Sequence, residues 1–485
     1  MKQIIKKLFF GLAVTAFSGL YATFIIDRAG SYSLGGDLID PGVDVVQISA
    51  SNVIFDLSEN TISLGSNGIV IDPGISNVTV RNGRITQIIN NGISIGDGCV
   101  NINLDNIEIM QCGNNAVRVN QACSGVFMTN LALLGTNKSA ISVDHDAKTI
   151  QGNTLKIGTC AGSAIELLGT STGNVVRDIL LDNVITMSVC LSPLYTKAIR
   201  VDYGLNVILR NITMVNSGNK YNQLNLIGFN NCYQCTVAQV AASGNSGTSL
   251  TGINLSSTTS TIVQGVNLVN NNSLSGNLTG FLFANYSSNN LIALCRVLTS
   301  SATGGNAIGY CAESTSERTI FRDCDIAALM GTNVTGFDLH DNGSLGSFNL
   351  LEGCQVVNCL ATTGSFVGFN IDGCDKGTVF DSVASYNSAL LGRSVGLLFK
   401  TPSGGNRWNI NQCKFVRNYG MDDNNSYGVL IEAGVENLFV KNFAFDNGQL
   451  ANTQMQGVPL GSITQLTTDN LNSADTPWAN IIIIP

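Results

Sequence analysis

Carboxylate and guanidinium side chains recur at matching places in the first half of the chain, and one imidazole, that of His145, lies beside them. Asp97, Asp144 and Asp202 each follow a short apolar run, and Glu166 lies inside another. Paired carboxylates are the groups that cleave glycosidic bonds by acid-base or nucleophilic chemistry, so these four are the candidate catalytic residues. The side chains beside them supply the candidate ligand-binding set: Arg118, Ser142, His145, Glu166 and Arg200.

A repeated phrase determines where these residues lie. The stretch SNVTVRNGRI at 76–85 alternates apolar and polar residues and turns at Asn82, and later stretches such as VNINLDNIEI and NVILRNITM repeat it. The residue in the Asn82 place recurs every 22 to 30 residues. Alternation with period two indicates strands, and so short a unit buries its apolar face only by stacking on copies of itself. We therefore predict an all-β, single-stranded parallel β-helix (solenoid) of about 15 coils, each rising about 4.8 Å.

Asparagine is frequent at the turn itself. It tolerates the left-handed backbone that a sharp corner needs, and its amide can bond to the Asn of the next coil. Contact with sugars is the less favoured interpretation, because the corner geometry already explains these amides. We predict a structural ladder of corner residues: Asn82, Asn106, Asn130, Asn153, Asn183, Asn211 and Asn442.

The same interval aligns the candidate site as one wall on the early coils. A polar column nine residues before each corner holds Asp97, Gln121, Asp144, Asn174 and Asp202. The outward place of the preceding strand holds Ser94, Arg118, Ser142, Glu166 and Arg200. Carboxylates two coils apart would have backbones about 9.6 Å apart, near the upper limit for inverting glycosidases. We expect Arg200 to pair with Glu166, leaving Arg118 and the Asp column free. The alternative is a solvated sheet face with turn Asp residues.

The types and spacing of the cysteines and histidines give little support for a metal site. Cys295, Cys324 and Cys354 occupy an otherwise aliphatic column, so we expect buried thiols that pack as small hydrophobes. Cys232 and Cys235 form a lone C-x-x-C, for which packing is favoured over a redox or zinc half-site. The two histidines would lie roughly 34 Å apart, too far to share an ion. We expect no metal and no cofactor. Calcium is the alternative that stays open without a specific motif to support it, and a glycine-rich phosphate loop is missing.

Composition and the chain ends predict location and domains. Residues 1–22, MKQIIKKLFFGLAVTAFSGLYA, have the basic start, apolar run and small-residue end of a secretory signal. An uncleaved anchor is the alternative, and no later stretch is long enough to span a bilayer. The net charge of −8 argues against nucleic acid. We predict a signal peptide at 1–22, an N-terminal cap at 23–46, the β-helix at 47–447 and a C-terminal cap or docking tail at 448–485. Oligomerisation through this tail is an alternative, and the protein is expected to be secreted, periplasmic or on the cell surface.

The start of the repeats resembles a known family. GSYSLGGDL and VQISASNVIFDLSENTI are similar to the first coil of secreted right-handed parallel β-helix proteins of the pectate-lyase-like superfamily. The resemblance covers about residues 29–447 and implies a right-handed coil. Pectate lyases carry Trp-Ile-Asp-His and R-x-P-x-x-R, whereas SVDHD here keeps Asp144-His145 with Ser142 in the Trp place, and R-x-P does not occur. The polygalacturonase phrase G-D-D is reduced to Asp97-Gly98, and N-T-D and G-H-G do not occur.

Two functions from different classes remain. The first is a carbohydrate- or surface-binding and adhesion rod that engages a polysaccharide or a host or cell-surface glycan. The alternative is a polysaccharide lyase or glycoside hydrolase that uses the acidic wall of the early coils. The repeat interval never exceeds 30 residues, which leaves little room for the long loops that wall an enzyme's groove, so the binding function is favoured.

Overall fold

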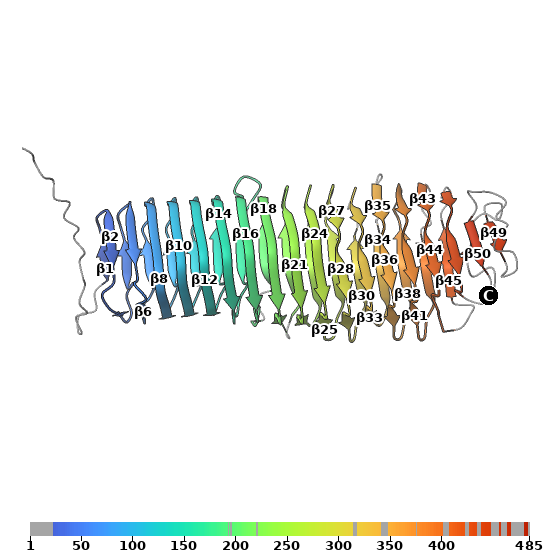
Figure 1. Ribbon diagram of the computed structural model, residues 1–485, viewed down its shortest axis with the longest axis horizontal. Coiled ribbons are helices and arrows are strands. Elements are labelled where there is room, and N and C mark those ends of the chain that lie inside the picture. The colour runs from blue at the N-terminus through green and yellow to red at the C-terminus, as the bar shows by residue number, and fades with distance from the viewer. Residues whose placement is uncertain are drawn as a thin grey trace, which may run out of the picture. The chain divides into compact units, whose positions relative to one another are not determined.

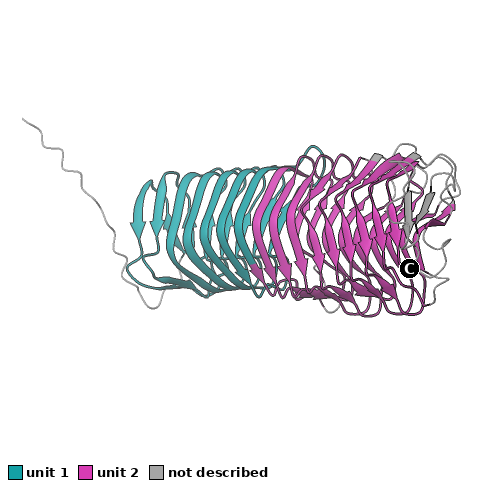
Figure 2. Ribbon diagram, turned by 45° about the vertical axis from the view of Figure 1, so that its right-hand side comes forward, with its two compact units in different colours: residues 1–185 teal, residues 186–485 magenta. Residues whose placement is uncertain are grey.

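The computed structural model describes residues 23–192, 194, 196–219, 222–313, 318–340, 348–374, 376–400, 407–421, 426–433, 438–447, 455–456, 463–466 and 480–483. In these residues the regular secondary structure is β-strand throughout, and we find no helix that is long and apolar enough to cross a membrane. The chain divides into two compact units, Met1–Ile185 and Thr186–Pro485, which Figure 2 colours separately. The predicted signal peptide at 1–22 lies outside the described residues.

The first unit has two parallel sheets, which we call 1a and 2a (Figure 1). Sheet 1a stacks β1 (Phe24–Ile26), β4 (Val46–Ile48), β7 (Ile69–Ile71), β9 (Ile93–Ile95), β11 (Val117–Val119), β13 (Ile141–Asp144) and β15 (Ile165–Leu168). Sheet 2a stacks β2 (Gly30–Ser33) and β3 (Leu38–Ile39), β5 (Val53–Asp56) and β6 (Thr61–Ser63), β8 (Ser76–Ile88), β10 (Val100–Cys112), β12 (Ser124–Thr136), β14 (Lys148–Gly158) and β16 (Val176–Met187), whose last two residues fall in the second unit.

The second unit has three parallel sheets, 1b, 2b and 3b. Sheet 1b stacks β17 (Lys197–Asp202), β20 (Leu224–Asn230), β23 (Leu250–Ser256), β26 (Leu278–Ala284), β30 (Ala307–Ala312), β34 (Val334–His340), β38 (Phe366–Asp372), β42 (Ser394–Lys400), β45 (Ser426–Ala433) and β48 (Met455–Gln456). Sheet 3b stacks the two-residue strands β19 (Gly218–Asn219), β22 (Ser246–Gly247), β25 (Asn272–Ser273), β29 (Ser301–Ala302), β33 (Met330–Gly331), β37 (Leu360–Ala361) and β41 (Ser388–Ala389).

Sheet 2b begins with long strands, and in later coils most of its strands occur as separate pairs. Its strands are β18 (Gly204–Val215), β21 (Thr236–Ser243), β24 (Ile262–Val269), β27 (Leu291–Ala293) and β28 (Arg296–Leu298), β31 (Ile320–Arg322) and β32 (Asp325–Ala327), β35 (Phe348–Glu352) and β36 (Gln355–Val357), β39 (Lys376–Phe380) and β40 (Val383–Ser385), β43 (Arg407–Asn411) and β44 (Lys414–Val416), β46 (Leu438–Val440) and β47 (Phe443–Phe445), β49 (Ile463–Leu466) and β50 (Asn480–Ile483).

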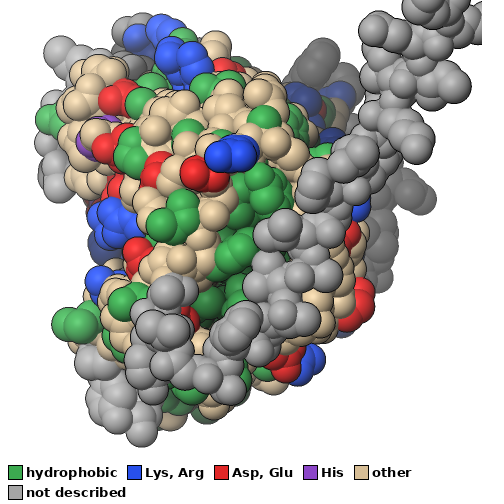
Figure 3. Space-filling model, turned by 90° about the vertical axis from the view of Figure 1, so that its left-hand side faces the viewer, with side chains coloured by type: hydrophobic (Ala, Val, Ile, Leu, Met, Phe, Trp, Pro, Cys, Tyr) green, Lys and Arg blue, Asp and Glu red, His purple; other side chains and the backbone are tan. Residues whose placement is uncertain are grey.

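Each strand pairs in parallel with its counterpart in the next coil, as the stacking argument requires. Val117 of β11 lies opposite Ile93 of β9 on one side and Ile141 of β13 on the other. This pairing confirms the predicted fold class, an all-β parallel β-helix. Residues expected as an N-terminal cap form the first coil, because β1, β2 and β3 pair with β4, β5 and β6. Hydrophobic side chains gather in the middle of the end face that Figure 3 shows, and Ile25 and Ile39 are more than half exposed.

Part of the Ile-rich C-terminal run also belongs to the coil. In the described residues of 448–485, β50 pairs in parallel with β47, so that Ile481 lies opposite Phe443. Strand β49 pairs with the other edge of β50. The backbone of this run therefore extends sheet 2b. The predicted cap and oligomerisation through the tail both stay predictions.

Left-handed residues make the corners. Five members of the predicted ladder have φ between 53° and 57°: Asn82, Asn106, Asn130, Asn183 and Asn211. Asn106 donates from Nδ2 to Oδ1 of Asn82 at 3.1 Å, which is the inter-coil bond that the ladder predicts. The sequence marked only this column, whereas Asn77 and Asn101, and Gln87 and Gln111, are also left-handed. Early coils of the first unit therefore turn at three left-handed columns.

The predicted ladder is wrong by one residue in two coils. Thr154 (φ 56°) is the corner instead of Asn153, and Lys441 (φ 53°) is the corner instead of Asn442. Asn442 is fully buried, where its Nδ2 donates to the Ile410 carbonyl at 2.8 Å and its Oδ1 accepts from the Cys413 amide at 3.0 Å. An inward amide that bonds two backbone groups satisfies buried polar atoms. This explains why Asn442 occupies the core-facing place and leaves the corner to Lys441.

The core of the second unit contains a column of stacked rings. Tyr310 stacks on Phe281 and Phe337 with ring centroids 4.6 and 4.7 Å apart, and Phe337 stacks on Phe369 at 5.3 Å. The buried Tyr310 hydroxyl donates to the Cys295 carbonyl at 2.7 Å. These rings face inward, so the residues that alternate with them in β30, β34 and β38 face outward.

The cysteines pack as the sequence predicted. All fourteen are free and buried, and Cys324 donates weakly from Sγ to the carbonyls of Ile292 and Arg322 at 3.6 and 3.4 Å. Cys232 and Cys235 are also buried, with Sγ atoms near the carbonyls of Val201 and Gly204. Burial raises the pKa of the Cys359 thiol to about 12, because a thiolate would lose its hydration there. Cys232, Cys235, Cys324 and Cys359 therefore pack as apolar filling.

Candidate functional site

A polar hollow of about 380 Å³ lies in the first unit, where β11, β13 and β15 end. Arg118 sits between two buried residues, Val117 and Val119, so its side chain points away from the core. The turns that follow the sheet 1a strands supply most of the other walls. The hollow is lined by Asp97, Arg118, Asn120, Gln121, Asp144, His145, Leu168 and Thr170.

Arg118 is the centre of the polar contacts. Its Nη2 lies 2.8 Å from Oδ2 of Asp144, and its Nε donates to Oδ1 of Asn120 at 2.8 Å. The Arg118 side chain is 40% exposed and that of Asp144 24% exposed, so both can still meet a ligand. The expectation that these two side chains have no ion-pair partner is wrong, because they neutralise each other across adjacent coils.

A second column in the hollow consists of Asp97, Gln121 and His145. The backbone fixes this alignment, because the Gly98 amide bonds to the Gln121 carbonyl and the Ala122 amide to the His145 carbonyl. Gln121 donates from Nε2 to Oδ2 of Asp97 at 3.2 Å. The predicted column had Asp144 in the place that His145 occupies, an error of one residue that follows from taking Asn153 as the corner. Asp144 instead precedes this column and lies opposite Leu168.

His145 and the 169–175 turn complete the walls. The buried Nδ1 of His145 lies 3.3 Å from Oδ2 of Asp146 but has no hydrogen-bond partner of good geometry. Asn174, placed in the polar column by the sequence, instead closes a tight turn, in which its carbonyl accepts from the Thr170 amide at 3.0 Å. This turn brings Thr170 to the hollow. The sequence did not single out Asn120 as a site residue. It lies two residues after Arg118, so period-two alternation would have placed it on the same face.

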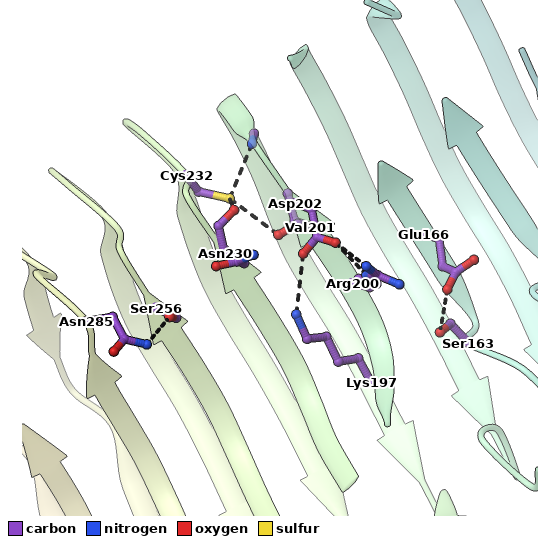
Figure 4. A network of polar contacts seen from close by, with 11 residues as sticks. Ser163, Glu166, Lys197, Arg200, Val201, Asp202, Asn230, Cys232, Ser256 and Asn285 are labelled. Atoms are coloured by element: carbon purple, nitrogen blue, oxygen red, sulfur yellow. Dashed lines mark hydrogen bonds and ion pairs between the residues drawn. The ribbon is translucent and has the colours of Figure 1, made fainter. Parts of the chain in front are cut away.

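Two other candidates lie on the sheet but do not line the hollow. Ser142 is opposite both Arg118 and Glu166, as predicted, but it is only 4% exposed. It therefore supports the sheet and cannot make a broad contact with a ligand. Glu166 accepts a hydrogen bond from Oγ of Ser163 at 3.3 Å (Figure 4).

Asp202 and Arg200 belong to the second unit and form a closed cluster there. Asp202 is 6% exposed, and it accepts from Nε of Arg200 at 2.6 Å and contacts Nζ of Lys197 at 3.4 Å (Figure 4). The expectation that Asp202 is free for a ligand is wrong, because two cations already neutralise its buried carboxylate. The predicted pair of Arg200 with Glu166 joins residues of different units and stays a prediction.

The hollow offers hydrogen-bond donors and acceptors at close range. Its guanidinium, amide, carboxylate and hydroxyl groups are those that bind the hydroxyls of a sugar. Asp97 and Asp144 both line it, but each already accepts a hydrogen bond, from Gln121 and from Arg118. The arrangement therefore fits recognition of a polar ligand more directly than acid-base chemistry.

Fold and hollow together define the class of protein as a parallel β-helix with a polar surface site. No protein-family model and no curated protein matches the sequence. The chain is similar to the Dettilon tailspike protein (gp208), with 12% identity, a TM-score of 0.36 and coverage of 62% of this chain and 60% of that one. It is similar to the A-module of the Azotobacter vinelandii mannuronan C-5 epimerase AlgE6, with 10% identity, a TM-score of 0.32 and coverage of 79% and 90%.

A family 28 exopolygalacturonase of Yersinia enterocolitica is a third similar structure. It is 10% identical, with a TM-score of 0.22 and coverage of 80% of this chain and 71% of that chain. The chain spans about 60% of the length of the Dettilon tailspike.

Proposed function

We propose that the protein is an exported glycan-binding β-helix that holds a polysaccharide in the hollow of the first unit. The observation that supports this is the ring of polar groups around a space of about 380 Å³, which is within the usual range of ligand sites, roughly 300 to 1,000 Å³. Arg118 gives the site a fork of donors, and Asp97, Gln121 and Thr170 surround it with acceptors and donors. The signal-like sequence at 1–22 supports export to the periplasm, the medium or the cell surface.

A glycan panel tests this function. Purified protein without residues 1–22 is incubated with immobilised polysaccharides, and the affinity for any ligand found is then measured for Arg118→Ala and Gln121→Ala. Hydrogen bonds to charged groups contribute about 1.5 to 3 kcal/mol, so Arg118→Ala should weaken binding roughly 10- to 100-fold. Arg81→Ala is the matched control, because Arg81 is similarly exposed and also pairs with an aspartate, Asp56, but lies outside the hollow.

The same panel tests cleavage. If chain ends accumulate and Asp144→Asn abolishes their release while binding persists, the protein is a polysaccharide-cleaving enzyme and the binding proposal is too narrow. If Arg118→Ala and Gln121→Ala bind every ligand as the parent does, the hollow is not the site. Retention of the parent's melting temperature in both variants shows that lost binding is not lost folding.

A further inference from the structure

A second group of reactive side chains lies on the outer face of sheet 1b, in the unit that the proposed function does not use. Cys311 lies in β30 and His340 ends β34, and Glu313 directly follows β30. One ligand atom from each, the Cys311 sulfur, a Glu313 carboxylate oxygen and a His340 nitrogen, all lie within 4.8 Å of one another. The three residues come from two adjacent coils.

The pairing of the strands explains why these side chains meet. Tyr310 and Phe337 stack inside the core, so the residues that follow them, Cys311 and Asp338, face outward and lie opposite each other. Two residues further on, Glu313 and His340 face the same side, because side chains alternate along a strand. The next coil adds Asn370 opposite Asp338 and Asp372 opposite His340.

Cys311 thus differs from the thiols that fill the core. It is only 3% exposed, yet it occupies an outward position in the strand. Asp338 lies opposite it, and Glu313 lies two residues further along the chain. Burial raises the pKa of this thiol well above its usual range, and the nearby carboxylates of Asp338 and Glu313 raise it further. A cation among these groups would offset the cost of the thiolate.

We propose that Cys311, Glu313 and His340 bind a zinc ion. Thiolate sulfur, imidazole nitrogen and carboxylate oxygen are the protein ligands of Zn²⁺, and three of them leave a fourth position for water or a ligand. This proposal departs from the expectation of no metal, which considered only a site shared by the two histidines and a half-site at Cys232 and Cys235. When the ion binds, the Cys311 thiol releases its proton to the solvent, and a thiolate–zinc bond replaces the S–H bond.

Two neighbouring residues orient His340. In metal sites, residues that contact a ligand without touching the ion commonly have this role. Oδ1 of Asp338 lies 3.5 Å from Nδ1 of His340, and Nδ2 of Asn370 donates to the same Asp338 oxygen at 2.7 Å. A carboxylate on one imidazole nitrogen orients the ring and makes the other nitrogen a better ligand. In this arrangement Nε2 is the nitrogen that remains for the ion.

Metal titration of the full exported chain tests the site. Reduced protein, freed of metal by a chelator, is titrated with Zn²⁺ by calorimetry, and with Co²⁺ while near-ultraviolet thiolate-to-cobalt absorption is recorded. We expect one ion per chain and a thiolate band. Cys311→Ser should abolish the band, and His340→Gln should weaken binding on the order of a hundredfold or more. Asp338→Asn should keep the band and weaken binding roughly 10- to 100-fold.

Cys359→Ser is the matched control, because Cys359 is a buried thiol of the same unit outside the cluster. It should bind zinc as the parent does. If Cys311→Ser fails to fold, the zinc affinity of His340→Gln tests the site instead. The His340 side chain is 36% exposed, so its replacement leaves the core intact. The proposal is overturned if the parent takes up no stoichiometric zinc, if His340→Gln binds like the parent, or if the thiolate band disappears in Cys359→Ser.

Discussion

Arg118 and Asp144 are each other's partner, so replacing them tests both stability and binding. Exposed ion pairs contribute about 0 to 1 kcal/mol, and both side chains of this pair are partly exposed. We expect the double variant Arg118→Ala with Asp144→Ala to lower the free energy of unfolding by less than about 1 kcal/mol while weakening glycan binding. Chemical denaturation measures the first and the glycan panel the second. A loss of stability of several kcal/mol would show that the pair holds the coils together.

His340 should make stability depend on pH in the metal-free protein. The hydrogen bond with Asp338 raises the pKa of His340 above its ordinary 6.5, with the carboxylates of Glu313 and Asp372 adding to it and burial opposing it. A raised pKa contributes stability that is complete below the unfolded pKa and is lost as the pH rises through the folded one. The difference in melting temperature between the parent and His340→Gln should therefore shrink as the pH rises above 6.5. A difference that grows with pH contradicts this assignment.

At the scale of the element, the corners show how strongly the fold imposes a backbone conformation. Leu294 occupies a left-handed corner with φ 54° and is 53% exposed, although the left-handed region costs an ordinary residue roughly 1 to 2 kcal/mol. Leu294→Asn should raise the free energy of unfolding by about 1 kcal/mol, since Asn adopts this conformation at lower cost. Thermal melts check the direction. Asn106→Leu, in the equivalent place, should lower stability by a similar amount. A loss of stability in Leu294→Asn, or a gain in Asn106→Leu, would contradict the corner assignment.

A column of glycines sets how closely the coils of sheet 1b approach. A Cβ added to Gly280 would lie 2.5 Å from the Gly309 carbonyl oxygen and 2.5 Å from a Val297 methyl group. Overpacking of this kind typically costs about 1 to 3 kcal/mol. Gly280→Ala should therefore clearly lower the denaturant concentration at the midpoint of unfolding. Gly36→Ala is the control, because a Cβ there meets nothing within 4 Å. Equal midpoints for the two variants would show that the column is not tightly packed.

At the scale of the whole molecule, the first testable boundary is the start of the exported chain. The sequence predicts cleavage after Ala22, two residues before β1 begins at Phe24. Intact mass of protein recovered from the periplasm, medium or cell surface should correspond to a chain starting at Thr23. A mass that includes Met1 to Ala22 would instead support an uncleaved anchor.

The repeat interval and the period-two alternation were sufficient to predict the parallel β-helix, because both are local properties of the chain. A strand side chain faces in or out according to its parity, and a unit too short for its own core must stack. The same patterns predicted the buried thiols, the outward place of Arg118 and five of the left-handed Asn corners. These features depend only on residues close together in one coil.

Tertiary structure decided the register between coils wherever the repeat left more than one choice. Asn153 and Thr154 were both acceptable corners by type, and only the pairing of Leu131 with Leu155 set Thr154 opposite Asn130. This register places His145, not Asp144, in the column of Asp97 and Gln121. Cys311 and His340 come together because β30 and β34, which are one full coil apart along the chain, pair in register. Register between coils depends on how many residues each turn uses, and a change of one residue moves every following side chain to the opposite face.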